Sequence, residues 1–243
     1  MKKVGLFLWV LLLFNITSHA QSKVIDSTGL MIIERMSEVI TELQSCRIGV
    51  TTVYDIAHPE LGLIKYTEVA DILMKGPDKL LMTLKGDKGE RVFSYDGKVF
   101  TYYSFENNRY AQIESPGTIL HMADTIYSTF GIDFYAIDFF YPDFIDMLIQ
   151  SSTALTFLGR TTIDGKECFH IAGAAEEFTY QIWIRNDPYF LPEKAVIVFK
   201  KQAMNPQFEA SYTWETNPVI PDAVFDFDIP PKAVETKVIP VKK

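Results

Sequence analysis

The sequence predicts an α+β protein: a single large curved antiparallel sheet, a half-barrel of about eleven strands, with helices on its concave face. Three observations favour this class. Residues 72–114 read as four strands joined by tight turns, and Asp96-Gly97 is typical of a two-residue hairpin. Residues 117–150 then change to helical spacing, and strand-like segments return after residue 155. A sheet this large curls, so its concave side needs helices to cover it.

The amino terminus has the three parts of a secretory signal peptide. Lys2 and Lys3 precede an apolar run over residues 4–14, and Ser18-His19-Ala20 offers small residues to a peptidase. We expect residues 1–20 to be a signal peptide cleaved near Ala20, which predicts a periplasmic protein. A retained anchor is the alternative, although the apolar run is short for a membrane span.

The remaining chain, residues 21–243, has the size and composition of one domain. Hydrophobic residues make up 48% of the chain, which is ample for a core. The formal net charge of the whole 243-residue chain is −8, and no basic run is present. This argues against binding of nucleic acid and against docking on anionic lipid. We expect a monomer.

The elements of the first half follow in order. Apolar residues at helical spacing, from Ile32 to Leu43, predict an N-terminal amphipathic helix over residues 28–44. Gly76-Pro77 breaks the second strand, because proline lacks a donor and fixes its own φ. The strands expected here are 46–54, 63–74, 79–84, 90–95, 98–103 and 109–113.

A helical insert is predicted over residues about 117–150. Its first helix carries apolar residues on one face and ends at Gly131. A second helical piece begins near Pro142. Between them, residues 134–141 form a dense aromatic connector. The strands expected after the insert are 155–162, 167–172, 178–184, 194–200 and 208–214.

Motifs for catalysis and metal binding are missing from the sequence. His58, His121 and His170 fall on different predicted elements, and Cys168 with His170 supplies too few ligands for zinc. We therefore expect no catalytic residue, no metal site and no cofactor. A carboxylate pair for hydrolysis stays open, because such pairs need not be close in sequence. Cys46 and Cys168 either form a disulfide or remain buried thiols.

The aromatic and apolar strand faces are the positive signal. Each of these residues alone is explained by core packing and cross-strand pairing. Together they provide more apolar wall than a few short helices fill, which predicts a hydrophobic cavity. The expected ligand-binding residues are Phe93, Tyr95, Phe100, Tyr102, Ile119, Met122, Ile126, Phe130, Tyr180 and Ile182.

The order of these motifs resembles the LolA/LolB-like periplasmic lipoprotein-carrier fold. The shared features are the break at Lys75-Gly76-Pro77, the hairpin Asp96-Gly97-Lys98 with aromatic residues after it, and the motif spanning residues 222–231. The resemblance implies a half-barrel whose hollow takes lipid acyl chains. The carriers place an arginine immediately before this proline, where this chain has Gly76. The resemblance therefore extends to the hollow more than to lipoprotein transfer.

More closely, residues 28–234 are similar to the uncharacterised family called domain of unknown function 2092. The likeness is carried by residues 91–98, 131–133, 181–184 and 191–194.

Two hypotheses follow. The first is a non-catalytic periplasmic carrier that holds a lipid, an acyl chain or another hydrophobic ligand in the concave face. The alternative is a cell-envelope interaction module without a small ligand, in which the aromatic connector docks a protein partner. Burial of Phe139, Phe140 and Tyr141 within the monomer would remove the basis of the second.

Overall fold

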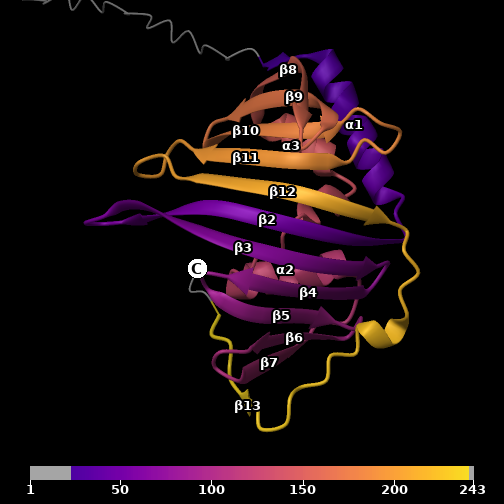
Figure 1. Ribbon diagram of the computed structural model, residues 1–243, viewed down its shortest axis with the longest axis vertical. Helices are drawn as coiled ribbons and strands as arrows, with labels where there is room; N and C mark the ends of the chain where they lie inside the picture. Colours follow the sequence, from indigo (N-terminus) through magenta and orange to yellow (C-terminus); the bar gives the residue numbers. More distant parts are fainter. Residues whose placement is uncertain (1–22, 241–243) are drawn as a thin grey trace, which may run out of the picture.

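The structure of the protein, a computed structural model, describes residues 23–240. The expected signal peptide and its cleavage site lie outside the described residues. One curved sheet of thirteen strands dominates the fold, and Figure 1 shows it from its convex side. Eleven of these strands are long. They are β2 Ser45–His58, β3 Gly62–Lys75, β4 Lys79–Gly86, β5 Gly89–Tyr95, β6 Val99–Ser104, β7 Arg109–Glu114, β8 Ser152–Ile163, β9 Lys166–Ala175, β10 Phe178–Arg185, β11 Pro192–Phe199 and β12 Gln207–Thr216.

These eleven strands confirm the predicted fold class, and each pairs antiparallel with its neighbour. Two further strands, β1 Val24–Ile25 and β13 Val234–Glu235, add parallel edges beside β8 and β7. They were not predicted, because two residues carry no periodicity. Both edges of the sheet are therefore very short strands, which limits edge-to-edge association.

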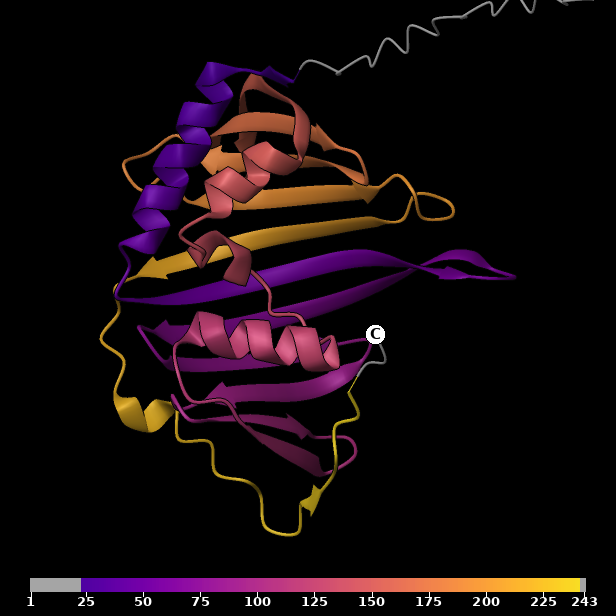
Figure 2. The same cartoon turned by 180° about the vertical axis from the view of Figure 1, so that it is seen from behind.

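The strand order explains where the helical insert must lie. The sheet runs β1-β8-β9-β10-β11-β12-β2-β3-β4-β5-β6-β7-β13, so the insert leaves from β7 near one edge and returns to β8 near the other. It can make this crossing only over one face. Figure 2 shows the insert and the N-terminal helix together on the concave face of the sheet.

The helices begin and end where the sequence places capping residues. Helix α1, Ser27–Thr41, starts at Asp26, whose carboxylate accepts a 2.8 Å hydrogen bond from the Thr28 N–H. Helix α2, Ile119–Phe130, ends at Gly131, which has the left-handed φ of 66°. The insert continues with the 3-10 helix η1, Ile137–Phe140, and helix α3, Phe144–Ser151. No helix within residues 23–240 is long and apolar enough to cross a membrane.

Both cysteines are buried free thiols. Cys46 lies on β2 and Cys168 on β9, with β10, β11 and β12 between them. Four strand spacings of about 4.8 Å separate the two, well beyond the limit of about 7 Å between the Cα atoms of a disulfide. Of the two alternatives left by the sequence, the fold selects separate thiols.

Candidate functional site

The larger cavity lies between the insert and strands β10, β11 and β12. Its volume is about 420 Å³, within the range of about 300–1,000 Å³ typical of ligand sites. Its walls are mainly aromatic and aliphatic. The lining residues are Ile33, Val50, Asp133, Phe134, Tyr135, Ala136, Asp138, Phe139, Phe144, Leu148, Phe178, Tyr180, Gln181, Ile182, Ala195, Ile197, Phe199, Phe208, Ala210 and Tyr212.

Small residues at inward positions form the floor of the larger cavity. Ala195 pairs with Ile182 on one side and with Ala210 on the other, so two alanines lie side by side in the sheet. Ile197 and Phe208 form the neighbouring pair, and both remain half-buried although they face inward. Inward apolar residues that stay accessible indicate a hollow that the insert spans without filling.

The end wall of the larger cavity depends on Gly173 of β9. The Tyr180 ring lies directly over this glycine, so that a Cβ atom there would come within 2.1 Å of the ring. The Tyr180 hydroxyl forms a 2.8 Å hydrogen bond with the Ser152 hydroxyl. The missing side chain at Gly173 therefore leaves room for the Tyr180 ring, and the hydrogen bond to Ser152 fixes the position of its hydroxyl.

Two tyrosine–carboxylate hydrogen bonds hold the aromatic connector on the sheet. The Tyr135 hydroxyl donates to Glu68 Oε2 over 2.7 Å, and Glu68 is 3% exposed and paired with Arg91. At the other end of the connector, the Tyr141 hydroxyl donates to Asp124 Oδ1 over 2.6 Å. The connector is therefore fastened on both sides of η1, where it roofs the larger cavity.

The aromatic residues of the connector contact the protein's own sheet. The Phe139 ring is buried and lies 5.7 Å from the Tyr212 ring, and the Phe140 ring lies 6.4 Å from the Trp214 ring. Phe140 and Tyr141 are half-buried. These contacts account for the connector within the monomer. Of the three anchors named by the interaction-module hypothesis, only Phe139 is buried, so the hypothesis is weakened and stays a prediction.

Two carboxylates stand among the apolar walls. Burial raises the pKa of Asp133, and burial together with the Asp133 carboxylate raises the pKa of Asp138. Both residues are nevertheless exposed to solvent at the cavity wall, so the rise in their pKa reflects partial desolvation by the neighbouring walls and not enclosure. Within residues 23–240, the cavity lining contains no Lys, Arg or His. Among the described residues, no group of three or more His, Cys, Asp or Glu side chains is placed to hold a metal ion.

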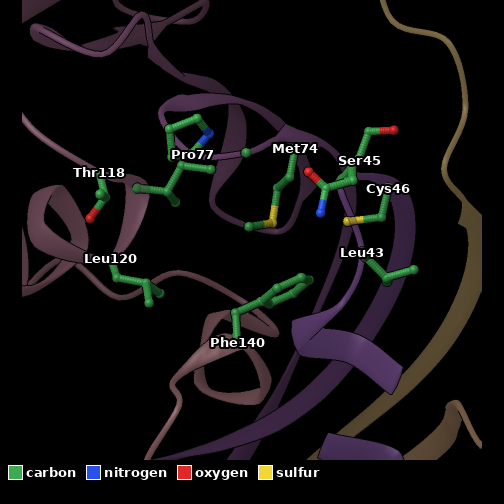
Figure 3. Close-up of a pocket in the computed structure, with 11 residues that line it drawn as sticks. Leu43, Ser45, Cys46, Met74, Pro77, Thr118, Leu120 and Phe140 are labelled. Carbon is green, nitrogen blue, oxygen red and sulfur yellow. The ribbon is translucent and has the colours of Figure 1, made fainter. Parts of the chain in front are cut away.

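A smaller cavity of about 230 Å³ lies on the other side of η1. Figure 3 shows Met74, Leu120 and Phe140 around it, with Cys46 at its edge. Burial raises the pKa of Cys46 to about 12, so the thiol stays protonated and unreactive at neutral pH. Phe140 faces the smaller cavity and Phe139 the larger one, so η1 divides the two.

The structure separates the residues that the sequence predicted as one ligand site. Tyr180 and Ile182 line the larger cavity, and Ile119 lines the smaller one. The other seven line neither cavity. They belong to β5, β6 and α2 and form or pack against the core: Phe93, Tyr95, Phe100, Tyr102, Met122, Ile126 and Phe130.

The core beneath α2 is solid because the connector contributes a ring to it. Phe134 inserts edge-on between Phe93 and Phe100, with ring centroids 5.8 and 5.7 Å away. The Tyr95 hydroxyl shares its one proton between the carbonyl oxygens of Ser115 and Gly117, 2.7 and 2.8 Å away, and holds the start of the insert. The predicted wall of aromatic residues is thus filled in this half of the sheet.

Several lining residues were missed by the sequence. Ala195 and Ala210 occupy inward positions on strands that were predicted correctly, and their small size was the available signal. Asp133 and Asp138 lie on either side of Phe134 and Tyr135 in the connector and gave no signal of their own.

Comparison with solved structures supports the fold. The chain is similar to lipoprotein LppX from Mycobacterium tuberculosis, with a TM-score of 0.53 and 16% identity over 81% of this chain and 98% of that one. It is also similar to LprF from Mycobacterium bovis, with a TM-score of 0.51 and 15% identity over 87% of this chain and 99% of that one. At these identities the likeness shows the architecture alone.

Sequence comparison gives the family. No curated protein matches the chain. A family model with the description "Predicted periplasmic protein (DUF2092)" matches residues 30–239, nearly the whole of the described chain. This confirms the closer of the two resemblances seen in the sequence. The chain belongs to the DUF2092 family of predicted periplasmic proteins.

Proposed function

We propose that this protein is a non-catalytic periplasmic carrier that holds a hydrophobic ligand, such as a lipid or an acyl chain, in the larger cavity. Export through a signal peptide cleaved near Ala20 is part of the proposal. The single observation that carries it is the cavity itself, about 420 Å³ with mainly apolar walls beneath a fastened roof. Burial of a ligand methylene in such a site contributes about 0.8 kcal/mol.

The packing of the two halves of the sheet supports a built site. Beneath α2, inward residues such as Tyr95 and Phe100 are fully buried and line neither cavity. Beneath η1 and α3, inward residues such as Ile197 and Phe208 stay accessible. Apolar side chains that stay accessible contribute less to stability than buried ones. A bound ligand would explain why the inward residues of this half are left accessible.

The proposal is tested with protein recovered from the periplasm. Native mass spectrometry and organic extraction are expected to yield a bound apolar molecule, and a fluorescent acyl-chain probe is expected to bind the extracted protein. Recovery of no such molecule, together with no binding of the probe, would rule the carrier function out.

A cavity-filling variant locates the site. Ala195→Phe places a ring on the cavity floor and is expected to weaken probe binding about tenfold or more. A tenfold loss of affinity corresponds to about 1.4 kcal/mol. The contribution of about two buried ligand methylenes, at about 0.8 kcal/mol each, is of this size. Ala172→Phe on β9 is the matched control, because Ala172 follows the inward-facing Ile171 and so faces the convex side. Equal affinity of both variants would contradict this location.

A further inference from the structure

The larger cavity has a polar region that its apolar walls do not explain. Asp133 and Asp138 of the insert line it, and Tyr212 of β12 lies in the same lining. Within residues 23–240, neither carboxylate forms an ion pair. Asp133 accepts one 3.2 Å hydrogen bond from the neighbouring Phe134 N–H, and the Asp138 carboxylate accepts none in this part of the chain.

Tyr212 adds a hydroxyl to this region. The residue is only 6% exposed, and its hydroxyl has no hydrogen-bond partner among the described residues. The Tyr212 ring lies 5.7 Å from the ring of Phe139, the residue next to Asp138, and both burial and the Asp138 carboxylate raise the pKa of Tyr212. The Tyr212 hydroxyl is therefore held by a buried side chain and remains accessible at the cavity wall, where it can meet a ligand's polar end.

The sign of the charge decides which polar end fits. The lining has two carboxylates and, among the described residues, no cationic side chain. An acidic end would bring a third negative charge into a partly dehydrated site. An ammonium group would pair with the carboxylates and donate hydrogen bonds to them, and charge-assisted hydrogen bonds are the strong ones.

We propose that the larger cavity selects an amphiphile whose polar end is a protonated amine, held by Asp133 and Asp138 beside Tyr212, over an acid of equal chain length. The apolar chain extends along the floor formed by Ala195 and Ala210. This inference rests on the proposed function and specifies the chemistry of its ligand.

The test compares three ligands of equal chain length at pH 7: decylamine, decanol and decanoate. Each displaces a neutral fluorescent probe, N-phenyl-1-naphthylamine, from the purified protein below the concentration at which the ligand aggregates. Decylamine is expected to bind at least about tenfold more tightly than decanoate, the factor that corresponds to about 1.4 kcal/mol. Decanol is expected to fall between them.

Variants assign the preference to the two carboxylates. Asp133→Asn with Asp138→Asn is expected to weaken decylamine binding about tenfold or more and to leave decanol nearly unchanged. The matched control is Asp143→Asn with Asp146→Asn, which removes two charges from positions of the same insert that do not line the cavity. It is expected to change no affinity by more than about twofold, as for surface charges.

Three results would overturn the inference. Decanoate binding as tightly as decylamine would do so, as would a double Asn variant of the cavity that keeps the preference. If all three ligands bind equally, the carrier function stands and the amine preference falls. If none displaces the probe and the probe itself does not bind, both proposals fall together.

Discussion

The hydrogen bond between Tyr135 and Glu68 offers the sharpest perturbation of the cavity roof. Tyr135→Phe removes one hydroxyl and leaves the ring. The bond is 2.7 Å long and its acceptor is a carboxylate that is 3% exposed, so its loss costs about 2 kcal/mol. For a domain of this size, this corresponds to a decrease in Tm of about 4–8 °C.

Tyr141→Phe is the matched comparison, because it makes the same chemical change at the other end of the connector. Its acceptor Asp124 is exposed, so water replaces the lost donor. The expected cost is about 0.5 kcal/mol, or about 1–2 °C. Thermal unfolding followed by circular dichroism measures both. Equal losses, or a larger loss for Tyr141→Phe, would refute the view that the buried carboxylate fastens the roof.

Three further predictions concern charge, packing and thiol reactivity. Asp138 has a raised pKa in the folded state, so its carboxylate form costs stability that is regained as the pH falls; Asp138→Asn is expected to raise Tm at pH 7, with the gain vanishing below about pH 4. A gain that persists at pH 3 would contradict this origin. Met122→Ala is expected to cost about 2–5 kcal/mol in urea unfolding, because Met122 is fully buried in the solid half. Relative ligand affinities are expected to stay unchanged, and a shift in them would show that the halves are coupled. Cys46, whose pKa burial raises to about 12, is expected to react with a thiol reagent at pH 8 only as fast as the protein unfolds. Immediate labelling of Cys46 in the native protein would show that it is accessible.

Sequence patterns predicted the fold closely because each element carries a local signal. Asp96-Gly97 marks a hairpin, Gly131 ends a helix, and all eleven long strands were expected near their observed positions. The parallel edge strands β1 and β13 were missed, since two residues show neither alternation nor a turn.

The candidate site shares only some of its lining with the residues that the sequence predicted, and the reason is physical. Alternation tells which side chains face inward, but not which inward side chains find a packing partner. Phe93 and Phe100 were expected to line a hollow, and Phe134 from the connector fills the space between them. Tyr180 faces the same way on a later strand, where the small Ala195 and Ala210 leave the cavity open. That difference depends on where the insert crosses the sheet, which is a tertiary property.

Photo-crosslinking tests the central claim, that a hydrophobic ligand lies between the insert and strands β10–β12, most directly. A decyl chain bearing a terminal diazirine is bound to the protein and irradiated, and the labelled residues are mapped by mass spectrometry. Labels are expected within residues 133–148, 178–182 and 195–212, which contain most of the cavity lining. Labels confined to residues 93–103, or scattered over the exposed surface, would contradict the claim.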